Sequence, residues 1–396
     1  MKAFALALAL VAADGDAWAA KAGAADARRA FRYGLEAYDA ARFDAAIQRF
    51  SEALELKPGW GVAAGLRGMC RWTNGDVRGA RRDAELAAKL KPADAEAYVA
   101  RGMARYVLKD LAGAKEDFLE AARLSPRHAL AHYGVGSVLS SESRTQDALE
   151  PLDKAVLLSP NAAVIRIVRA AVKDKLKQFR GAIEDYTKVI DVNPQFAWAR
   201  LYRARDYREI QEFARAVEDF TEFLGFYPDH EEALYLRANS HFILGDHAAA
   251  IKDLNRVIDL NPRRGLAWSN RGLAKSYVGD KDGALADLRK AMELEPNKRE
   301  KIQEVVEALE SRIKAEARTP ERVGGVAAEP LPDEEEREEL PLAPLPAPTP
   351  EELDGPRPGG LPPRRGARGD APEPRRTRPP AKPETVQDPT GTVFIE

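Results

Sequence analysis

The sequence contains only one cysteine among its 396 residues, Cys70. A single thiol excludes an intramolecular disulfide and any metal site built from several cysteines. Aromatic residues make up only 7% of the chain while alanine is plentiful, and this composition favours closely packed helices over sheets. The chain also lacks an excess of either charge, because 61 basic residues accompany 63 acidic ones. No overall attraction to nucleic acid follows from that balance.

Motifs for catalysis or cofactor binding are missing as well. No glycine-rich phosphate loop is present, and no nucleophile, base and orienting group come together in the sequence. His128 and His132 are four residues apart, but His128 precedes the expected helix and no carboxylate accompanies the two, which argues against zinc. We therefore predict a protein that is not an enzyme and holds neither cofactor nor metal. Cys70 is interpreted as a small residue that fills the core.

The apolar run over residues 3–13 is too short to cross a bilayer. It follows Lys2 and precedes Ala17-Trp18-Ala19, an arrangement typical of a signal peptide with a small-residue cleavage site. Ala20-Lys21-Ala22 is a second candidate for cleavage. We predict that residues 1–22 form a signal peptide and that the protein is exported, to the periplasm or outside the cell. The alternative is an alanine-rich helix that leads into the fold.

Proline recurs at a fixed interval of 34 residues along most of the chain. The prolines of this register are Pro58, Pro92, Pro126, Pro160, Pro194, Pro228, Pro262 and Pro296. An alanine lies twelve residues before each of them, at Ala46, Ala80, Ala114, Ala148, Ala182, Ala216, Ala250 and Ala284. Self-similarity at a fixed period is the signature of a repeat architecture.

Each repeat is expected to form two amphipathic helices. In the last one, Gly279 and Asp280 break the pattern, and Ala284, Leu288 and Ala291 then follow with the spacing of one helix face. Small residues in the first helix allow a neighbouring helix to approach: Gly34, Gly68, Gly102, Gly136, Ala170, Ala204, Ala238 and Gly272. The second helix carries a bulky residue at Phe50, Phe118, Tyr186, Phe220, Leu254 and Leu288.

This pattern resembles the tetratricopeptide repeat family over residues 27–296, as eight consecutive repeats. The chain departs from the family's aromatic position at Ala84 and Leu152. The resemblance implies an all-α fold, a right-handed α-solenoid superhelix of helical hairpins. It also implies that the first helices line a concave groove that binds proteins or peptides. We expect the repeats to occupy residues 23–296.

An arginine and an aspartate sixteen residues later recur together in the register. The pairs are Arg67 with Asp83, Arg101 with Asp117, Arg169 with Asp185, Arg203 with Asp219, Arg237 with Asp253 and Arg271 with Asp287. The first and fourth repeats lack both partners at once, which indicates direct contact across the hairpin. A guanidinium matches a carboxylate through two parallel hydrogen bonds. Because six copies cannot all be catalytic, we predict that the pairs are structural.

The chain changes character after the repeats. In residues 297–318, Ile302, Val305, Val306, Leu309 and Ile313 form one apolar stripe, typical of a helix that caps a stack of repeats. The alternative is a helix that binds a partner. Residues 319–396 are rich in proline and charge, so we expect a disordered tail that acts as a spacer. Its proline motifs and its end, "TGTVFIE", are alternative docking elements.

Some members of the resembled family are heat-shock co-chaperones, which grip a partner's terminal carboxylate with two asparagines and three basic residues. Asn239 and Asn270 have the spacing of that asparagine pair. However, Tyr235, Glu300 and Glu304 stand where the basic residues belong. We therefore reject a carboxylate clamp for this chain.

The predicted binding groove lies in the first four repeats and is apolar. Its expected lining is Phe31, Leu35, Tyr38, Met69, Trp72, Met103, Tyr106 and Tyr133. Aromatic and methionine side chains suit an apolar peptide or helix. The alternative is that some of these aromatics pack between neighbouring first helices. The middle repeats are polar at Asp174, Lys175, Arg205 and Arg208.

The sequence thus predicts an exported, non-enzymatic scaffold or adaptor that binds a protein or peptide in its concave groove. The alternatives are a holdase chaperone for unfolded clients, an enzyme with a site hidden in the superhelix, and an envelope tether. Nucleic acid and a membrane span are not expected. The identity of the partner and the oligomeric state stay open.

Overall fold

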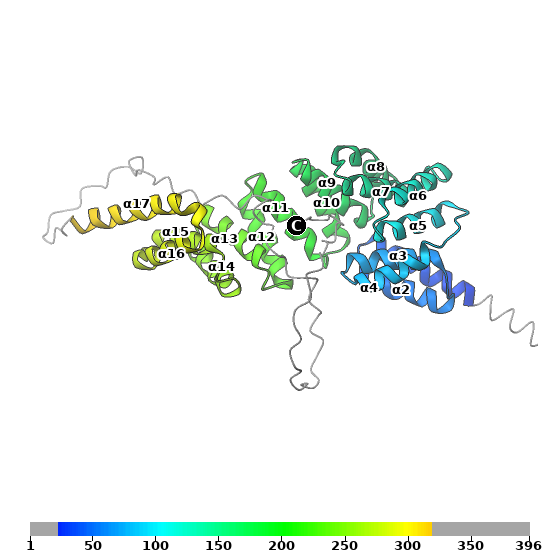
Figure 1. The fold of residues 1–396 in the computed structure, drawn as a ribbon, viewed down its shortest axis with the longest axis horizontal. Coiled ribbons are helices and arrows are strands. Elements are labelled where there is room, and N and C mark those ends of the chain that lie inside the picture. Colours follow the sequence, from blue (N-terminus) through cyan, green and yellow to red (C-terminus); the bar gives the residue numbers. More distant parts are fainter. Residues whose placement is uncertain (1–22, 319–396) are drawn as a thin grey trace, which may run out of the picture. The chain divides into compact units, whose positions relative to one another are not determined.

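A computed structural model describes residues 23–318 of the chain. These residues are helical throughout apart from short connections, and they contain no strand. They fall into two compact units, residues 23–199 and residues 200–318. Each unit consists of antiparallel helix pairs stacked side by side (Figure 1). The predicted all-α solenoid of helical hairpins is confirmed.

Each repeat contributes a first and a second helix of similar length. In chain order the helices are residues 23–39, α2 (Phe43–Leu56), α3 (Gly61–Thr73), α4 (Val77–Ala87), α5 (Ala95–Val107), α6 (Leu111–Leu124), α7 (Ala129–Ser141), α8 (Thr145–Leu158), α9 (Ala163–Lys175), α10 (Phe179–Val192), α11 (Ala197–Glu209), α12 (Phe213–Phe226), α13 (Glu231–Ile243), α14 (His247–Leu260), α15 (Gly265–Tyr277), α16 (Lys281–Leu294), the 3₁₀ turn η1 (Pro296–Lys298) and α17 (Arg299–Arg318).

The turn inside each hairpin contains one residue with left-handed backbone. Glycine fills this position at Gly279, where φ is +86°, and Asp280 then caps α16 by accepting a hydrogen bond from the Gly283 amide at 3.0 Å. The predicted break at Gly279-Asp280 is thereby confirmed. Five repeats place a residue other than glycine at this position, among them Lys177 with φ of +58°. These turns carry a backbone conformation that L side chains disfavour.

Close packing within the hairpins follows from the small residues of the register. All eight register alanines, from Ala46 to Ala284, are fully buried. At Gly102 an added Cβ would lie 2.8 Å from the ring of Phe118, so a larger residue there would require this ring to shift. The predicted role of these small residues is confirmed at this hairpin.

The six predicted arginine–aspartate pairs all form in the structure. Each arginine donates from Nε and Nη2 to the two carboxylate oxygens, at distances of 2.6–2.9 Å, in Arg67–Asp83, Arg101–Asp117, Arg169–Asp185, Arg203–Asp219, Arg237–Asp253 and Arg271–Asp287. The aspartates are buried, with exposed fractions of 1–5%. These contacts join the two helices of a hairpin, as the sequence predicted.

Additional cations distinguish one pair from another. Asp185 also accepts from Lys173 Nζ at 2.9 Å and from Arg166 Nη1 at 2.7 Å. Burial raises the pKa of Asp185, but the hydrogen bonds from Arg169 and Lys173 outweigh burial and leave the pKa below its usual value. Burial likewise raises the pKa of Asp219, and there the Arg203 guanidinium does not bring it down to the usual value.

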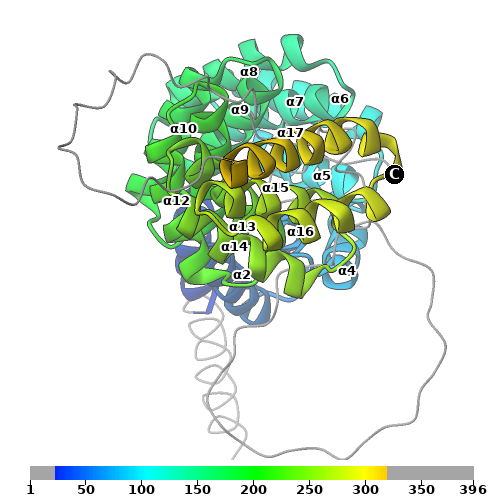
Figure 2. The ribbon, with the colours of Figure 1, turned by 90° about the vertical axis from the view of Figure 1, so that its left-hand side faces the viewer.

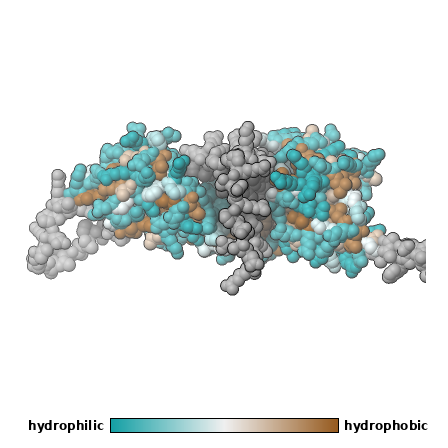
Figure 3. Space-filling view, turned by 60° about the horizontal axis from the view of Figure 1, so that its bottom comes forward, coloured by the Kyte–Doolittle hydropathy of each residue, from teal (hydrophilic) through white to brown (hydrophobic). Residues whose placement is uncertain are grey.

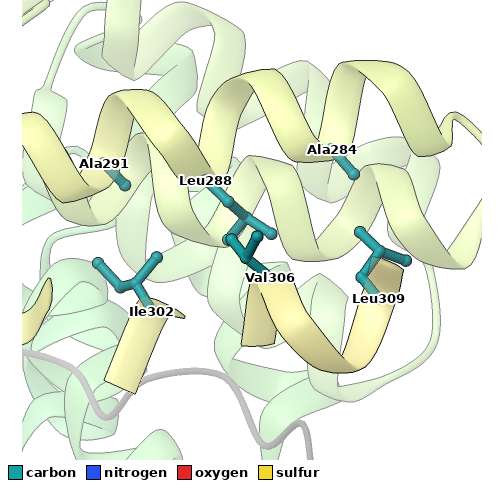
Figure 4. Close-up of a cluster of buried hydrophobic side chains, with 6 residues drawn as sticks. All are labelled: Ala284, Leu288, Ala291, Ile302, Val306 and Leu309. Atoms are coloured by element: carbon teal, nitrogen blue, oxygen red, sulfur yellow. The ribbon is translucent and has the colours of Figure 1, made fainter. Parts of the chain in front are cut away.

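The last helix covers the end of the array. Ile302, Val306 and Leu309 of α17 are buried against Ala284, Leu288 and Ala291 of α16 (Figure 4). Figure 2 shows α17 lying over the last hairpin. Val305 and Ile313, the other members of the predicted stripe, pack partly buried against the same cluster. This confirms the predicted capping helix.

Two predictions concern segments outside the described residues: the signal peptide over residues 1–22 and the disordered tail over residues 319–396. Among residues 23–318, none of the helices is both long and apolar enough to span a membrane.

Candidate partner-binding pocket

The side chains of the predicted groove are mostly buried in the first unit. Leu35 and Trp72 are half-buried. The others have exposed fractions of 0–7%: Phe31, Tyr38, Met69, Met103, Tyr106 and Tyr133. Packing between neighbouring first helices, the alternative interpretation, therefore describes most of them. A contact between these eight residues and a partner stays a prediction.

Tyr38, Cys70 and Tyr133 meet in the interior of this unit, although they belong to three different repeats. Burial raises the pKa of Tyr38 well above its usual value, and the neighbouring Tyr133 and Cys70 raise it further. Nearby, the hydroxyls of Tyr106 and Ser141 are 2.7 Å apart. Cys70 is fully buried, as the sequence predicted. The side formed by the first helices is thus filled by the chain itself.

A glycine explains why this interior is so narrow. A Cβ added at Gly65 would lie 2.6 Å from the carbonyl oxygen of Ala100, so the backbones of α3 and α5 approach closely at this point. In the 34-residue register Gly65 corresponds to Phe31 in the repeat before it and to Val99 in the repeat after it. The absence of a side chain at Gly65 therefore allows α3 and α5 to pack closely at this point.

A cavity of about 410 Å³ lies at the edge of the first repeats. Its lining comprises Ala24, Ala27, Arg28, Phe31, Arg32, Leu35, Lys57, Trp60 and Glu96. The helix of residues 23–39 supplies most of this lining, and the connection after α2 supplies Lys57 and Trp60. Of the predicted groove residues, Phe31 and Leu35 therefore belong to a pocket.

Aromatic rings form the apolar part of the pocket. The ring centroids of Phe31 and Trp60 are 4.6 Å apart with an interplanar angle of 32°. Lys57 Nζ lies 4.6 Å from the centroid of the Trp60 ring, on its face. This cation–π contact holds the ammonium group beside the apolar surface. The pocket therefore combines an aromatic surface with a positive charge.

The remaining charged residues make the lining positive overall. Arg28, Arg32 and Lys57 contribute three cations against the one carboxyl group of Glu96. Partial desolvation raises the pKa of Glu96, and the neighbouring Asp94 raises it further. Such a lining fits an apolar side chain that has acidic residues beside it.

The groove predicted from the sequence does not include Lys57 and Trp60. All of its residues belong to first helices, whereas Lys57 and Trp60 lie in "KPGW", at the connection between repeats. In the register Trp60 corresponds to Asp94 and His128, so periodicity provides no signal there. The only signal for this site is in the local sequence, where a tryptophan follows a lysine within the same short turn.

The polar residues of the second unit form a different arrangement. Asn270 Nδ2 donates to Asn239 Oδ1 at 2.8 Å and to the Tyr235 hydroxyl at 3.1 Å. The Arg264 guanidinium lies 3.9 Å from the centroid of the Tyr235 ring. The two asparagines are thus buried and bonded to each other, and Tyr235 lies where a clamp would require a lysine.

Of the polar groove residues predicted for the middle repeats, Asp174 and Lys175 belong to the first unit and Arg205 and Arg208 to the second. Asp174, Lys175 and Arg205 are exposed, and Arg208 is half-buried with a pKa lowered by burial. Within residues 23–318, no three side chains of His, Cys, Asp or Glu are grouped as a metal ion would require. His132 instead has its Nε2 atom 2.9 Å from the carbonyl oxygen of Pro126.

Comparisons with known proteins agree with this architecture. Family models described as tetratricopeptide repeat match residues 99–163, 201–265 and 266–298. A search of curated protein sequences gave no match. Among solved structures, the chain is similar to one described as the APC/C hetero-tetramer Cut9-Hcn1, with a TM-score of 0.50 and 14% identity. That match covers 68% of this chain and 53% of the other, so this chain spans about half the length of that one.

Two shorter structures are covered almost completely. YrrB, described as a TPR protein with an unusual peptide-binding site, has a TM-score of 0.44 and 18% identity over 51% of this chain and 99% of its own. Pseudomonas aeruginosa pilF has a TM-score of 0.44 and 15% identity over 56% of this chain and 98% of its own. These similarities concern the fold alone. With its helical hairpins in a 34-residue register and the matching family models, the chain belongs to the tetratricopeptide repeat family.

Proposed function

We propose that this tetratricopeptide repeat protein is a non-enzymatic adaptor that binds a partner protein through the pocket at its first repeats. The family provides the general role, because arrays of this kind are interaction scaffolds for proteins or peptides. The observation that carries the proposal is the pocket itself, in which Phe31, Trp60 and Leu35 form an apolar surface beside Arg28 and Lys57.

The chemistry of the pocket selects the kind of segment that binds. A volume of about 410 Å³ accommodates a large aliphatic or aromatic side chain with part of its backbone. The cations at its border favour aspartate or glutamate next to that side chain and disfavour lysine or arginine. The preferred ligand is therefore a short peptide segment with one apolar anchor and acidic neighbours.

A selection from a random peptide library displayed on phage, with the full chain as bait, tests this proposal. We expect the selected peptides to carry a large apolar residue beside Asp or Glu. The matched control is the double variant Arg28→Glu/Lys57→Glu, which reverses two charges of the pocket and leaves Phe31 and Trp60 unsubstituted. This variant should select peptides with Lys or Arg at the same places. Identical peptides from both baits would contradict the proposal.

The alternative of a holdase chaperone requires a broad apolar surface for unfolded clients. Most of the predicted apolar groove is buried, and on the face shown in Figure 3 hydrophobic residues occur in short stretches between hydrophilic ones. These observations favour the adaptor. Suppression of the aggregation of several unrelated unfolded proteins by the full chain would favour the holdase.

We also propose that the protein is exported, because Lys2, the apolar run over residues 3–13 and Ala17-Trp18-Ala19 have the order of a signal peptide. The full chain expressed in a bacterium with an envelope should lose its first 19 or 22 residues. The mass of the purified protein measures this. An intact Met1 on protein from the cytoplasm would contradict export.

A further inference from the structure

Two side-chain contacts join the beginning of the first unit to its far end. Asn193 Nδ2 donates to the carbonyl oxygen of Ala41 at 3.2 Å, across 152 residues of sequence. The rings of Phe43 and Phe196 meet edge to face with their centroids 6.2 Å apart. We refer to Ala41, Phe43, Asn193 and Phe196 as the clasp.

The clasp differs from most of the contacts that hold this unit together. Helices of the unit pack mainly on the next helix of the chain or on the next but one, as α3 packs on α4 and α5. A stack with contacts between neighbours alone changes its curvature by small rotations at each interface. Separation of the clasp requires only rotations of this kind. It therefore breaks no hairpin and none of the arginine–aspartate pairs, because each pair lies within one hairpin.

The clasp residues lie in the connections beside the filled interior or, in the case of Phe43, at the first residue of a helix. Ala41 is in the turn that follows the helix of residues 23–39, and Tyr38 is the last buried aromatic residue before that turn. Asn193 ends α10 and also accepts a hydrogen bond from the Gln195 amide at 3.2 Å, which fixes its side chain. Phe43 and Phe196 are themselves buried, with exposed fractions of 7% and 9%.

We infer that the clasp is a releasable closure, and that the first unit opens there to expose Tyr38, Cys70 and Tyr133. This inference does not rest on the proposed function of the pocket. In the open form, the aromatic and methionine side chains of repeats one to four line an accessible apolar surface. That surface is the groove which the sequence predicts and which the closed form buries.

Cys70 provides a built-in measure of this opening. It is the only cysteine of the chain, it is fully buried, and it lies next to Tyr38 and Tyr133. A thiol reagent such as 5,5′-dithiobis(2-nitrobenzoate) reacts with it only when the interior opens. The reaction rate of the native full chain therefore reports the opening equilibrium.

The experiment compares the wild type with Phe196→Ala and Asn193→Ala. Each variant removes one clasp contact, and we expect the rate of Cys70 modification to rise about tenfold, which corresponds to about 1.4 kcal/mol. Phe226→Ala is the matched control, because it removes a 43% exposed ring from α12 in the second unit. That control should leave the rate unchanged.

The urea dependence of the rate separates local opening from global unfolding. Opening at the clasp exposes the interior of repeats one to four and much less surface than global unfolding, so the rate should depend on urea less steeply than the unfolding transition does. This readout keeps the inference testable even if a clasp variant is less stable overall. A steep urea dependence from zero denaturant upward, with equal rates in Phe196→Ala and Phe226→Ala, would overturn the inference.

Discussion

Replacing the arginine of a buried pair should lower the free energy of unfolding by an amount that depends on whether a second cation still contacts the aspartate. In Arg237→Ala, Asp253 loses two hydrogen bonds of 2.7 and 2.8 Å while 5% exposed. Burial lowers the pKa of His241, one turn further along α13, so this imidazole is a weaker replacement for the guanidinium than a lysine at the same place. Breaking such a pair should destabilise the protein by roughly 2–4 kcal/mol.

The equivalent change in the last repeat is the internal comparison. In Arg271→Ala, Asp287 keeps Lys275 Nζ at 2.9 Å, so its charge stays paired. We expect this variant to be destabilised by only roughly 1–2 kcal/mol. The double variant Arg237→Met/Asp253→Leu removes both charges and should be more stable than Arg237→Ala.

Urea denaturation followed by circular dichroism measures these differences on the full chain. Because repeat arrays do not always unfold in two states, hydrogen exchange of α13–α14 and α15–α16 should locate the loss in the altered hairpin. Equal losses in Arg237→Ala and Arg271→Ala would refute the role given to Lys275. Additive effects of the single changes at Arg237 and Asp253 would show that the pair contributes nothing.

Three further changes test other parts of the structure. Gly65→Ala places a Cβ 2.6 Å from the Ala100 oxygen and should lower the free energy of unfolding by about 1–3 kcal/mol, whereas Gly225→Ala, with no atom within 4 Å, should not. Lys177→Gly relieves a φ of +58° and should raise the free energy of unfolding by up to about 1 kcal/mol, so the melting temperature should rise. A lower melting temperature would contradict this. Burial raises the pKa of Asp39 to about 6, so the native state retains a proton that the unfolded chain releases, and stability falls as the pH rises from about 4 to about 7. Asp39→Asn should match the wild type near pH 4 and exceed it by roughly 1–3 kcal/mol at pH 7, and equal denaturation midpoints at both pH values would refute this.

Periodicity allowed the local structure to be predicted almost completely. The register of Pro58 to Pro296 fixed the hairpins, and the joint absence of both partners in two repeats identified the arginine–aspartate contacts. These features depend only on residues within one repeat or in adjacent ones. The stripe of Ile302, Val306 and Leu309 revealed the capping helix for the same reason, since its partner surface is the preceding helix.

The state of the groove was harder to predict, because curvature accumulates over several repeats. The sequence indicated that Tyr38 and Tyr133 lie on the same side of the array. It did not show that α3 and α5 approach closely at Gly65, or that Tyr38 and Tyr133 are themselves buried. The contact of Asn193 with Ala41 spans 152 residues and has no counterpart in the register. Trp60 was missed because its partner Phe31 lies on a different element.

Hydrogen exchange with a bound peptide tests the central claim, that the partner binds at the first repeats. The full chain is compared with and without the tightest peptide from the display selection, at a saturating concentration. The account predicts slower exchange in residues 23–39, in the connection around Trp60 and at the start of α5 near Glu96. Slower exchange confined to α13 and α15, around Asn239 and Asn270, would contradict it and move the binding site to the second unit.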